Sequence, residues 1–349
     1  MELKTFLKVA VDKKASDLHM TADTVPIVRI DGRLIPLVDF PSLTREDCKR
    51  LVYSVLNDKQ KATFERDLEL DFSLEVPELN RFRVNVHMQR GSVEAAFRLV
   101  SLRIKSLEEL GLPPIVSELC RKNQGLILIT GPTGVGKTTT LAAMVDLINS
   151  ERQAIIIVIE DPIEYVHINR RSIIKQREVY SDTKSFANAL THALRQDPNV
   201  IVVGEMRDLE TISTALTAAE TGHLVLATLH TPDASQTEDR IIDVFPPYQQ
   251  QQVKIQLAGT LQAVISQQLL PRKERGGRVL ATEIMTGTSA IRNLIREHET
   301  EQLLTHIQTG VQYGMHTMDK SLKTLYQKGI ISEEIFKVYI KNPEEVRNM

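Results

Sequence analysis

The stretch LILITGPTGVGKT, residues 126–138, decides the fold of this chain. Its first five residues form an apolar run typical of a buried strand, and the rest fits the pattern G-x-x-x-x-G-K-[ST]. Glycines let backbone N–H groups converge on phosphate oxygens, and a following helix adds partial positive charge. The sequence therefore predicts a nucleotide-binding loop, which we favour over a bare glycine-rich turn. The predicted nucleotide-binding residues are Gly131, Pro132, Thr133, Gly134, Val135, Gly136, Lys137, Thr138 and Thr139.

Two of these residues indicate that the loop binds ATP and Mg²⁺. A lysine at this place bridges the β- and γ-phosphates, and the hydroxyl that follows it ligates Mg²⁺. We therefore expect Lys137 to bind ATP and Thr138 to hold Mg²⁺.

Buried strands alternate with helices around this loop. Continuous Val/Ile runs between helices are typical of a parallel sheet covered on both faces, so we expect an α/β domain. From about Pro246 onward the periodicity is that of helices. The predicted strands are Leu126–Thr130, Ala154–Ile159, Val200–Val203 and Leu224–Thr228, and the predicted helices are Lys137–Asn149, Thr183–Arg195 and Leu209–Thr221.

Acidic residues follow two of these strands. Ligands of parallel sheets gather at the carboxyl ends of strands, where Glu160, Glu164 and Glu205 lie. A nucleotide site commonly supplies an Asp to Mg²⁺ here, and Gly204-Glu205 takes that place. Glu205 is the predicted metal-side carboxylate, and Glu164 or Glu160 is the predicted base for the attacking water. The alternative is that these carboxylates only cap loops.

Two histidines flank the strand 224–228. Seven residues of strand separate His223 from His230 by roughly 23 Å, so they cannot share a zinc ion. His230 ends the strand at the edge of the carboxylates, which favours a γ-phosphate contact, although a loop histidine is the alternative.

The first hundred residues have another pattern. An apolar helix begins at Leu3, a hairpin turns at Asp31-Gly32, and a capping box at Thr44 begins a second helix. Alternating residues then predict further strands, giving two helices and about five strands in an α+β domain. We expect domains at 1–106 and 116–349, joined by a linker at 107–115 that contains Pro113-Pro114.

Composition excludes several classes. The 349 residues carry 43 Lys+Arg against 45 Asp+Glu and no Trp, which argues against a nucleic-acid tracking protein. Cys48 and Cys120 lie in no metal-binding spacing, so we expect neither a disulfide framework nor zinc. The N-terminus lacks the apolar core of a signal peptide, and no run approaches a membrane span. We expect a cytoplasmic protein.

Six segments together resemble the secretion ATPases of the type II secretion and type IV pilus superfamily, and within it the pilus-retraction ATPases. The resemblance covers essentially the whole chain. Its segments are Gly131–Thr138, Ile159–His167 (IEDPIEYVH), Val203–Thr211 (VGEMRDLET), Gly222–Thr231 (GHLVLATLHT), Ser16–His19 (SDLH) and Ala290–Glu297 (AIRNLIRE).

The resemblance implies a PAS-like N-terminal domain, a RecA-like motor domain with C-terminal helices, and a homohexameric ring. It implies an ATP-driven motor for pilus retraction and twitching motility, peripheral at the inner face of the cytoplasmic membrane, with an inner-membrane platform protein and an accessory retraction paralogue as partners. Within the superfamily, the alternatives are an accessory retraction ATPase and an ATPase for pilus assembly or type II secretion. The four-cysteine zinc module of the assembly ATPases is absent here. Two alternatives lie outside the superfamily, a nucleic-acid translocase and a non-hydrolysing nucleotide switch. DNA would stimulate ATP turnover by the first, and the second would release no phosphate.

The resemblance also assigns residue roles. Glu164 matches the catalytic glutamate, Glu205 the metal-side glutamate, and His223 and His230 the histidine box. Ring architecture implies an arginine donated by a neighbouring subunit. The candidates are Arg81, Arg83, Arg98 and Arg207.

Residues 290–297 match a segment needed for retraction, whereas its apolar face alone indicates core packing. We expect Ala290, Ile291, Leu294 and Ile295 on one helical face, with Arg292, Asn293, Arg296 and Glu297 facing elsewhere.

Overall fold

The computed structural model describes residues 2–30, 32–100, 103–274 and 276–342. The chain divides into two compact units, which we treat separately. The N-terminal unit comprises residues 1–103 with 162–166, and the motor unit comprises residues 104–161 with 167–349. Within the described ranges, no helix is both long enough and apolar enough to span a membrane.

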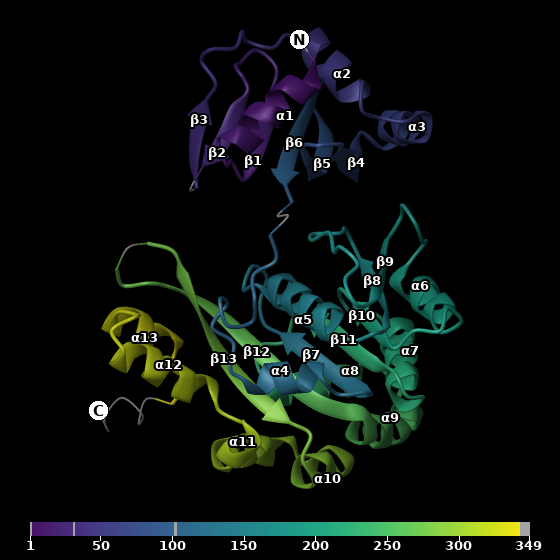
Figure 1. The fold of residues 1–349 in the computed structure, drawn as a ribbon, viewed down its shortest axis with the longest axis vertical. Coiled ribbons are helices and arrows are strands. Elements are labelled where there is room, and N and C mark those ends of the chain that lie inside the picture. The colour runs from purple at the N-terminus through teal and green to yellow at the C-terminus, as the bar shows by residue number, and fades with distance from the viewer. Residues whose placement is uncertain (1, 31, 101–102, 275, 343–349) are drawn as a thin grey trace. The chain divides into compact units, whose positions relative to one another are not determined.

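The N-terminal unit is one antiparallel six-stranded sheet with three helices (Figure 1). Its strand order is β3-β2-β1-β6-β5-β4. The elements are α1 (Leu3–Asp12), β1 (Asp17–Met20), β2 (Ile27–Ile30), β3 (Arg33–Pro36), α2 (Arg45–Tyr53), α3 (Asp58–Asp67), β4 (Glu69–Val76), β5 (Asn80–Gln89) and β6 (Ser92–Leu99).

The two faces of this sheet differ because side chains alternate along each strand. Leu18, Phe97 and Val84 lie side by side across β1, β6 and β5, and all are buried in the core. The neighbouring row, Asp17, Arg98 and Arg83, lies on the other face.

The α+β prediction for this region holds, with two additions. The first helix, the hairpin strands and the capping box of Thr44 with Asp47 are confirmed, whereas Asp31 of the turn lies outside the described residues. The count of two helices and about five strands is wrong because α3 and β1 were not predicted. Among the residues of α3 only Phe64 is buried, and β1 is four residues long, so neither has a usable periodicity.

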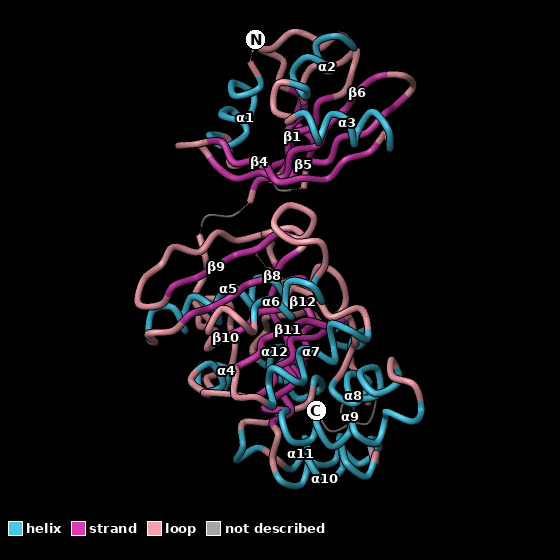
Figure 2. Tube along the Cα trace, turned by 90° about the vertical axis from the view of Figure 1, so that its right-hand side faces the viewer, coloured by secondary structure: helices cyan, strands magenta, loops and turns pink. Residues whose placement is uncertain are grey.

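The motor unit is built on a seven-stranded sheet of order β13-β12-β7-β11-β10-β8-β9. All neighbouring pairs are parallel except β12 with β13. Figures 1 and 2 show the sheet running through the unit with helices around it. Its strands are β7 (Gly125–Thr130), β8 (Ile155–Glu160), β9 (Ile173–Glu178), β10 (Val200–Val203), β11 (Leu224–Leu229), β12 (Leu261–Pro271) and β13 (Arg278–Thr286).

The helices of this unit include those predicted between the strands, and others follow the sheet. They are α4 (Ile115–Cys120), α5 (Lys137–Glu151), α6 (Phe186–Ala193), α7 (Leu209–Glu220), α8 (Ala234–Asp243), α9 (Pro247–Thr260), α10 (Ser289–Glu297), α11 (Leu303–Thr309), α12 (Met318–Gln327) and α13 (Glu333–Tyr339), with short 3₁₀ turns at Thr300–Gln302 and Val311–Tyr313.

The expected helical C-terminal part is wrong for residues 261–286, which form the long hairpin of β12 and β13. Leu261, Val264 and Ile265 have helical spacing, but they pack in the sheet beside β7. Short apolar segments are ambiguous between the two periods, and the partner strand lies over a hundred residues earlier in the chain. The parallel sheet is therefore a mixed sheet with one antiparallel edge strand.

Candidate nucleotide site

The glycine-rich loop has the geometry of a phosphate cradle. It joins β7 to α5, whose N-cap residue is Gly136, and no side chain caps that helix start. The first N–H groups of α5 are therefore not satisfied by a cap side chain and suit an anion. Gly131 has φ +136°, and a Cβ there would lie 2.5 Å from the carbonyl oxygen of Gln267. Only glycine fits this close approach of two backbones.

Side chains of strand β12 form hydrogen bonds with residues on both sides of the loop. Thr130 and Ser266 share a buried hydrogen bond of 2.8 Å between their hydroxyls. The side-chain amide of Gln267 donates to the Thr140 hydroxyl of α5 at 2.7 Å. The sequence predicts neither contact, because the apolar spacing of this segment suits a helix.

Lys137, His230 and Glu205 converge beside the loop. The Lys137 ammonium donates to the carbonyls of Gly131 and Pro132 at 2.7 and 3.0 Å, and its nitrogen lies 3.4 Å from Nδ1 of His230. Nε2 of the same imidazole lies 3.2 Å from Glu205. Two parallel strands, β10 and β11, bring Glu205 and His230 to one edge, as expected for their carboxyl ends.

Glu205 also accepts a hydrogen bond of 2.7 Å from Arg207, two residues along the chain. Burial on its own raises the pKa of Glu205. This hydrogen bond and the charges of His230 and Arg207 outweigh burial and hold the pKa below its ordinary value. The carboxylate is therefore ionised at neutral pH, as a metal-side ligand must be. Arg207 therefore has an anionic partner within the same chain.

The other predicted site residues have different surroundings. Glu160 ends β8, is buried and accepts a hydrogen bond of 3.3 Å from Gln176, whereas Glu164 is exposed and belongs to the N-terminal unit. His223 precedes β11, so it lies at the amino end of the sheet, where Nδ1 is 2.9 Å from the carbonyl of Ala218. Within one subunit His223 and His230 therefore stand at opposite ends of a strand.

The donor set fits Mg²⁺. The Thr138 hydroxyl and the Glu205 carboxylate are hard oxygen ligands of the kind that Mg²⁺ prefers. Within the described part of the chain, no three His, Cys, Asp or Glu side chains lie close enough to hold a metal by themselves. A magnesium ion here would therefore take its other ligands from water and phosphate oxygens, as is common for nucleotide-bound Mg²⁺.

An open cavity of about 690 Å³ adjoins the site. Its wall includes Glu205, Arg207 and His230, and it continues along α8 past Asp239 and Arg240. A larger cavity of about 840 Å³, between α4 and the end of β13, does not include the loop residues, so size alone does not locate the chemistry.

The N-terminal arginines differ in their contacts. Arg98 donates a hydrogen bond to Asp17 at 2.9 Å. Burial on its own raises the pKa of Asp17, but hydrogen bonds from Ser16 and Arg98 hold it below its ordinary value. Arg83 lies opposite Arg98 in the sheet and makes no ion pair or side-chain hydrogen bond with the described residues. Arg81, the remaining candidate in this unit, has a half-buried side chain.

The predicted face of residues 290–297 is partly wrong. Ile291, Leu294 and Ile295 are buried, but Ala290 is exposed. Arg292, expected to face elsewhere, turns back to the end of α9. Its guanidinium donates to the carbonyls of Gly287, Ala258 and Leu261 at 2.8 to 2.9 Å, and also to that of Gly259. Arg292 is thus a structural side chain, whereas Asn293, Arg296 and Glu297 are exposed.

The chain matches the family described as Type II/IV secretion system protein over residues 2–339. It is 48% identical over 344 residues to the type IV pilus retraction ATPase PilT of Pseudomonas aeruginosa, and the match covers 99% of each chain. It is 47% identical over 321 residues to a twitching motility protein of Neisseria gonorrhoeae, covering 92% of this chain and 86% of that one. Its structure is similar to the crystal structure of the pilus retraction motor PilT with bound ADP, with a TM-score of 0.94 and 50% identity over the full length of both.

Proposed function

The chain belongs to the family of type II/IV secretion system proteins, and on that premise we propose that it is an ATP-hydrolysing motor that powers the retraction of type IV pili. One observation carries the proposal: Lys137, His230 and Glu205 converge beside a phosphate loop in a chain 48% identical to PilT. Twitching motility is then the cellular output.

The proposed chemistry is transfer of the γ-phosphoryl group to water. Lys137 and the N–H groups at the start of α5 hold the phosphates, and His230 contacts the γ-phosphate from the edge of β11. Thr138 and Glu205 would hold Mg²⁺, which offsets the phosphate charge when bound. Glu164, rather than Glu160, is the proposed base, and its exposed side chain supports that choice.

We propose that the site is completed by a neighbouring subunit of a homohexameric ring. Of the candidate arginines, Arg98 is held by Asp17 and Arg207 by Glu205, so each already has an anionic partner. These contacts support Arg83 as the arginine that reaches the neighbour's phosphates. A PAS-like N-terminal domain and a RecA-like motor domain are the proposed assignments of the two units.

The mechanical partner in this proposal is an inner-membrane platform protein at the pilus base, which places the ring at the inner face of the cytoplasmic membrane. An accessory retraction paralogue is a second proposed partner.

The test of the proposed function is Lys137→Ala in the full chain. Loss of the fixed ammonium should abolish steady-state phosphate release and weaken binding of a fluorescent ATP analogue. Lys122→Ala, an exposed lysine of the same unit, is the matched control and should keep normal turnover. Near-normal turnover in Lys137→Ala would exclude this site, and normal twitching in cells that carry only this variant would exclude the motor function.

A further inference from the structure

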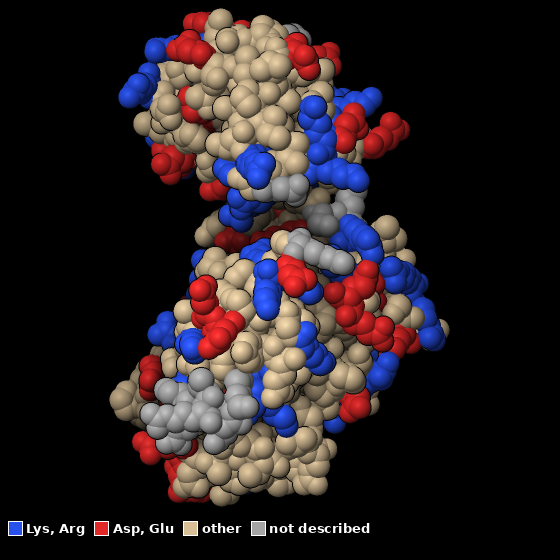
Figure 3. All heavy atoms as spheres, turned by 90° about the vertical axis from the view of Figure 1, so that its left-hand side faces the viewer, with Lys and Arg blue, Asp and Glu red and all other residues tan. Residues whose placement is uncertain are grey.

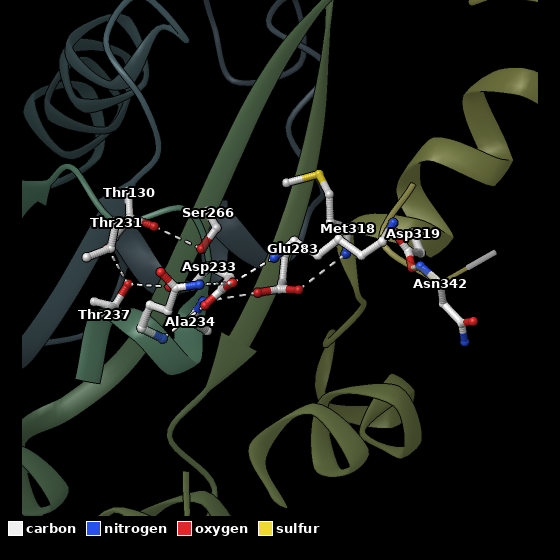
Figure 4. Close-up of polar contacts among 12 residues, drawn as sticks. Thr130, Thr231, Asp233, Ala234, Thr237, Ser266, Glu283, Met318, Asp319 and Asn342 are labelled. Atoms are coloured by element: carbon white, nitrogen blue, oxygen red, sulfur yellow. Dashed lines mark hydrogen bonds and ion pairs between the residues drawn. The ribbon is translucent and has the colours of Figure 1, made fainter. Parts of the chain in front are cut away.

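A buried carboxylate outside the nucleotide site joins that site to the C-terminal helices. Glu283 lies in the middle of β13 and is only 4% exposed. One carboxylate oxygen accepts from the backbone N–H of Ala234, the first residue of α8, at 3.1 Å. The other accepts from the N–H of Met318, the first residue of α12, at 3.4 Å. Figure 4 shows the carboxylate between these two helix starts.

The start of α8 is connected by hydrogen bonds to the loop that carries His230. Ala234 is the fourth residue after His230. Between them, the Thr231 and Thr237 hydroxyls share a hydrogen bond of 2.6 Å, and Thr237 also donates to the carbonyl of Asp233. A shift of the first turn of α8 is therefore transmitted to the segment that begins at His230.

A second tie joins the same helix start to the end of the described chain. Asp233 caps α8 by accepting from the N–H of Gln236 at 2.9 Å, and it forms an ion pair of 2.6 Å with Lys341. Asp319 of α12 accepts from the backbone N–H groups of Lys341 and Asn342, both at 2.9 Å. The C-terminal helices are thus held to α8 by two independent contacts.

A carboxylate suits this place better than any neutral side chain. Helix N-termini carry partial positive charge and unsatisfied N–H groups, and only a carboxylate offers two acceptor oxygens in one plane. Burial raises the pKa of Glu283, and the hydrogen bonds from Ala234 and Met318 and the charge of Lys341 oppose the rise. Glutamine has the same size but would turn an N–H donor toward one helix start.

We propose that Glu283 is a positioning residue for His230: by joining the N-termini of α8 and α12 it fixes the His230 loop against the nucleotide site and couples that loop to the C-terminal helices. This inference rests on the proposed function, because His230 must contact the γ-phosphate for its position to matter. Glu283, in the edge strand β13, would then affect ATP hydrolysis without contacting the nucleotide.

The test compares Glu283→Gln and Lys341→Met in the full chain, each alone and combined with His230→Asn. A displaced His230 should lower kcat about 10- to 100-fold for Glu283→Gln and less for Lys341→Met. The KM for ATP should change less than about 2-fold, because Lys137 and the loop are untouched. Combined with His230→Asn, neither substitution should lower kcat further, since both act through that side chain. Lys337→Met, which removes an ion pair within α13, is the matched control and should leave kcat unchanged.

Three outcomes would overturn the inference: wild-type kcat in Glu283→Gln, an equal loss of kcat with and without His230, or no effect of His230→Asn alone. Thermal unfolding and light scattering check that each variant folds and assembles. If Glu283→Gln fails to fold, the exposed Lys341→Met decides by the same criteria. The proposed function fails separately, through normal turnover in Lys137→Ala, so the two failures are distinguishable.

Discussion

At the scale of single residues, the three glutamates predicted for the nucleotide site differ in what surrounds them. Glu205 is shared by Arg207 and His230, Glu160 is buried beside Gln176, and Glu164 is exposed. A base for hydrolysis must reach a water molecule and remain ionised. Exposure favours Glu164 for that role, whereas the contacts of Glu160 favour a structural one.

Glutamine substitutions separate these two carboxylates. Glu164→Gln should bind Mg-ATP normally but hydrolyse it about 10²- to 10⁴-fold more slowly, because the water loses its base. Glu160→Gln keeps the size of the buried side chain and should retain most of the turnover. Single-turnover phosphate release, with nucleotide affinity measured in parallel, checks both. The opposite ranking would make Glu160 the base.

A fourth carboxylate, Glu238 in α8, predicts a pH dependence of stability. Its side chain is 2% exposed, neither oxygen has a hydrogen-bond partner in the described structure, and burial raises its pKa to about 7. Between about pH 4.5 and 7 the folded chain holds a proton that the unfolded chain has released. The free energy of unfolding therefore falls as pH rises through that window, by about 3 kcal/mol for this group, and stays lower above it.

Glu238→Gln should remove that fall. The variant is expected to match the wild type at pH 5 and to exceed it by about 1–3 kcal/mol at pH 8, because no charge is then buried. Urea unfolding at the two pH values measures the difference. Glu108→Gln removes a charge at an exposed position and should leave the dependence on pH unchanged. An unaltered slope in Glu238→Gln would contradict the prediction.

At the scale of elements, α10 contacts the motor unit through two kinds of side chain. Its apolar face packs in the core, and Arg292 closes the end of α9 by donating to carbonyls that the helix leaves free. Figures 1 and 2 show α10 beside α9. Arg296, one turn later, is exposed and lies 3.4 Å from Asn293.

The two arginines should therefore behave differently. Arg292→Ala leaves several carbonyls without a donor and should lower the free energy of unfolding by about 3 kcal/mol. Arg296→Ala should change it by less than about 0.5 kcal/mol. We expect Arg296→Ala to assemble and hydrolyse ATP yet to reduce twitching, if the exposed face of the segment serves retraction. Thermal unfolding, phosphate release and motility at matched protein level test this, and normal twitching would leave the segment a packing element.

The elements that could be predicted from sequence are those specified by their own residues. Val200–Val203 is a continuous apolar run between polar flanks, and it is β10. Residues 261–271 carry a spacing that suits a helix equally well, and they form β12 because β7 and β13 pair with its two edges. The fold was therefore predictable where burial leaves a local pattern, and not where a distant strand decides.

The same distinction holds for the site. The loop pattern predicts Lys137, and the rule that parallel strands end at one edge predicts that Glu205 and His230 lie close together. Glu283 and Arg292 were not predicted as structural contacts, because all their partners except Gly287 lie more than thirty residues away in sequence. One signal was present: Glu283 is an acidic residue within the buried stretch 281–286 of β13, which indicates a buried partner.

At the scale of the whole molecule, charge argues against a polymer-tracking role. Lys/Arg and Asp/Glu side chains are interspersed over the face of the motor unit in Figure 3, and the net charge is −2. A single-sign stripe that would follow nucleic acid is absent from that face. Light scattering of the full chain with an ATP analogue should report about six subunits.

Mixed rings test whether a site is shared between neighbours. Lys137→Ala removes the loop lysine, and Arg83→Ala removes the arginine that we propose acts on the next subunit, so each variant alone should hydrolyse ATP very slowly. A one-to-one mixture restores about a quarter of the interfaces, those in which an intact loop faces an intact arginine. Phosphate release should therefore recover on mixing and subunit exchange. Arg66→Ala, an exposed arginine paired with Asp67, is the control and should be active alone. If the mixture stays as inactive as its parents, or if Arg83→Ala is active alone, Arg83 does not complete the neighbour's site, and the arginine must be sought at Arg81 or, after release from Asp17, at Arg98.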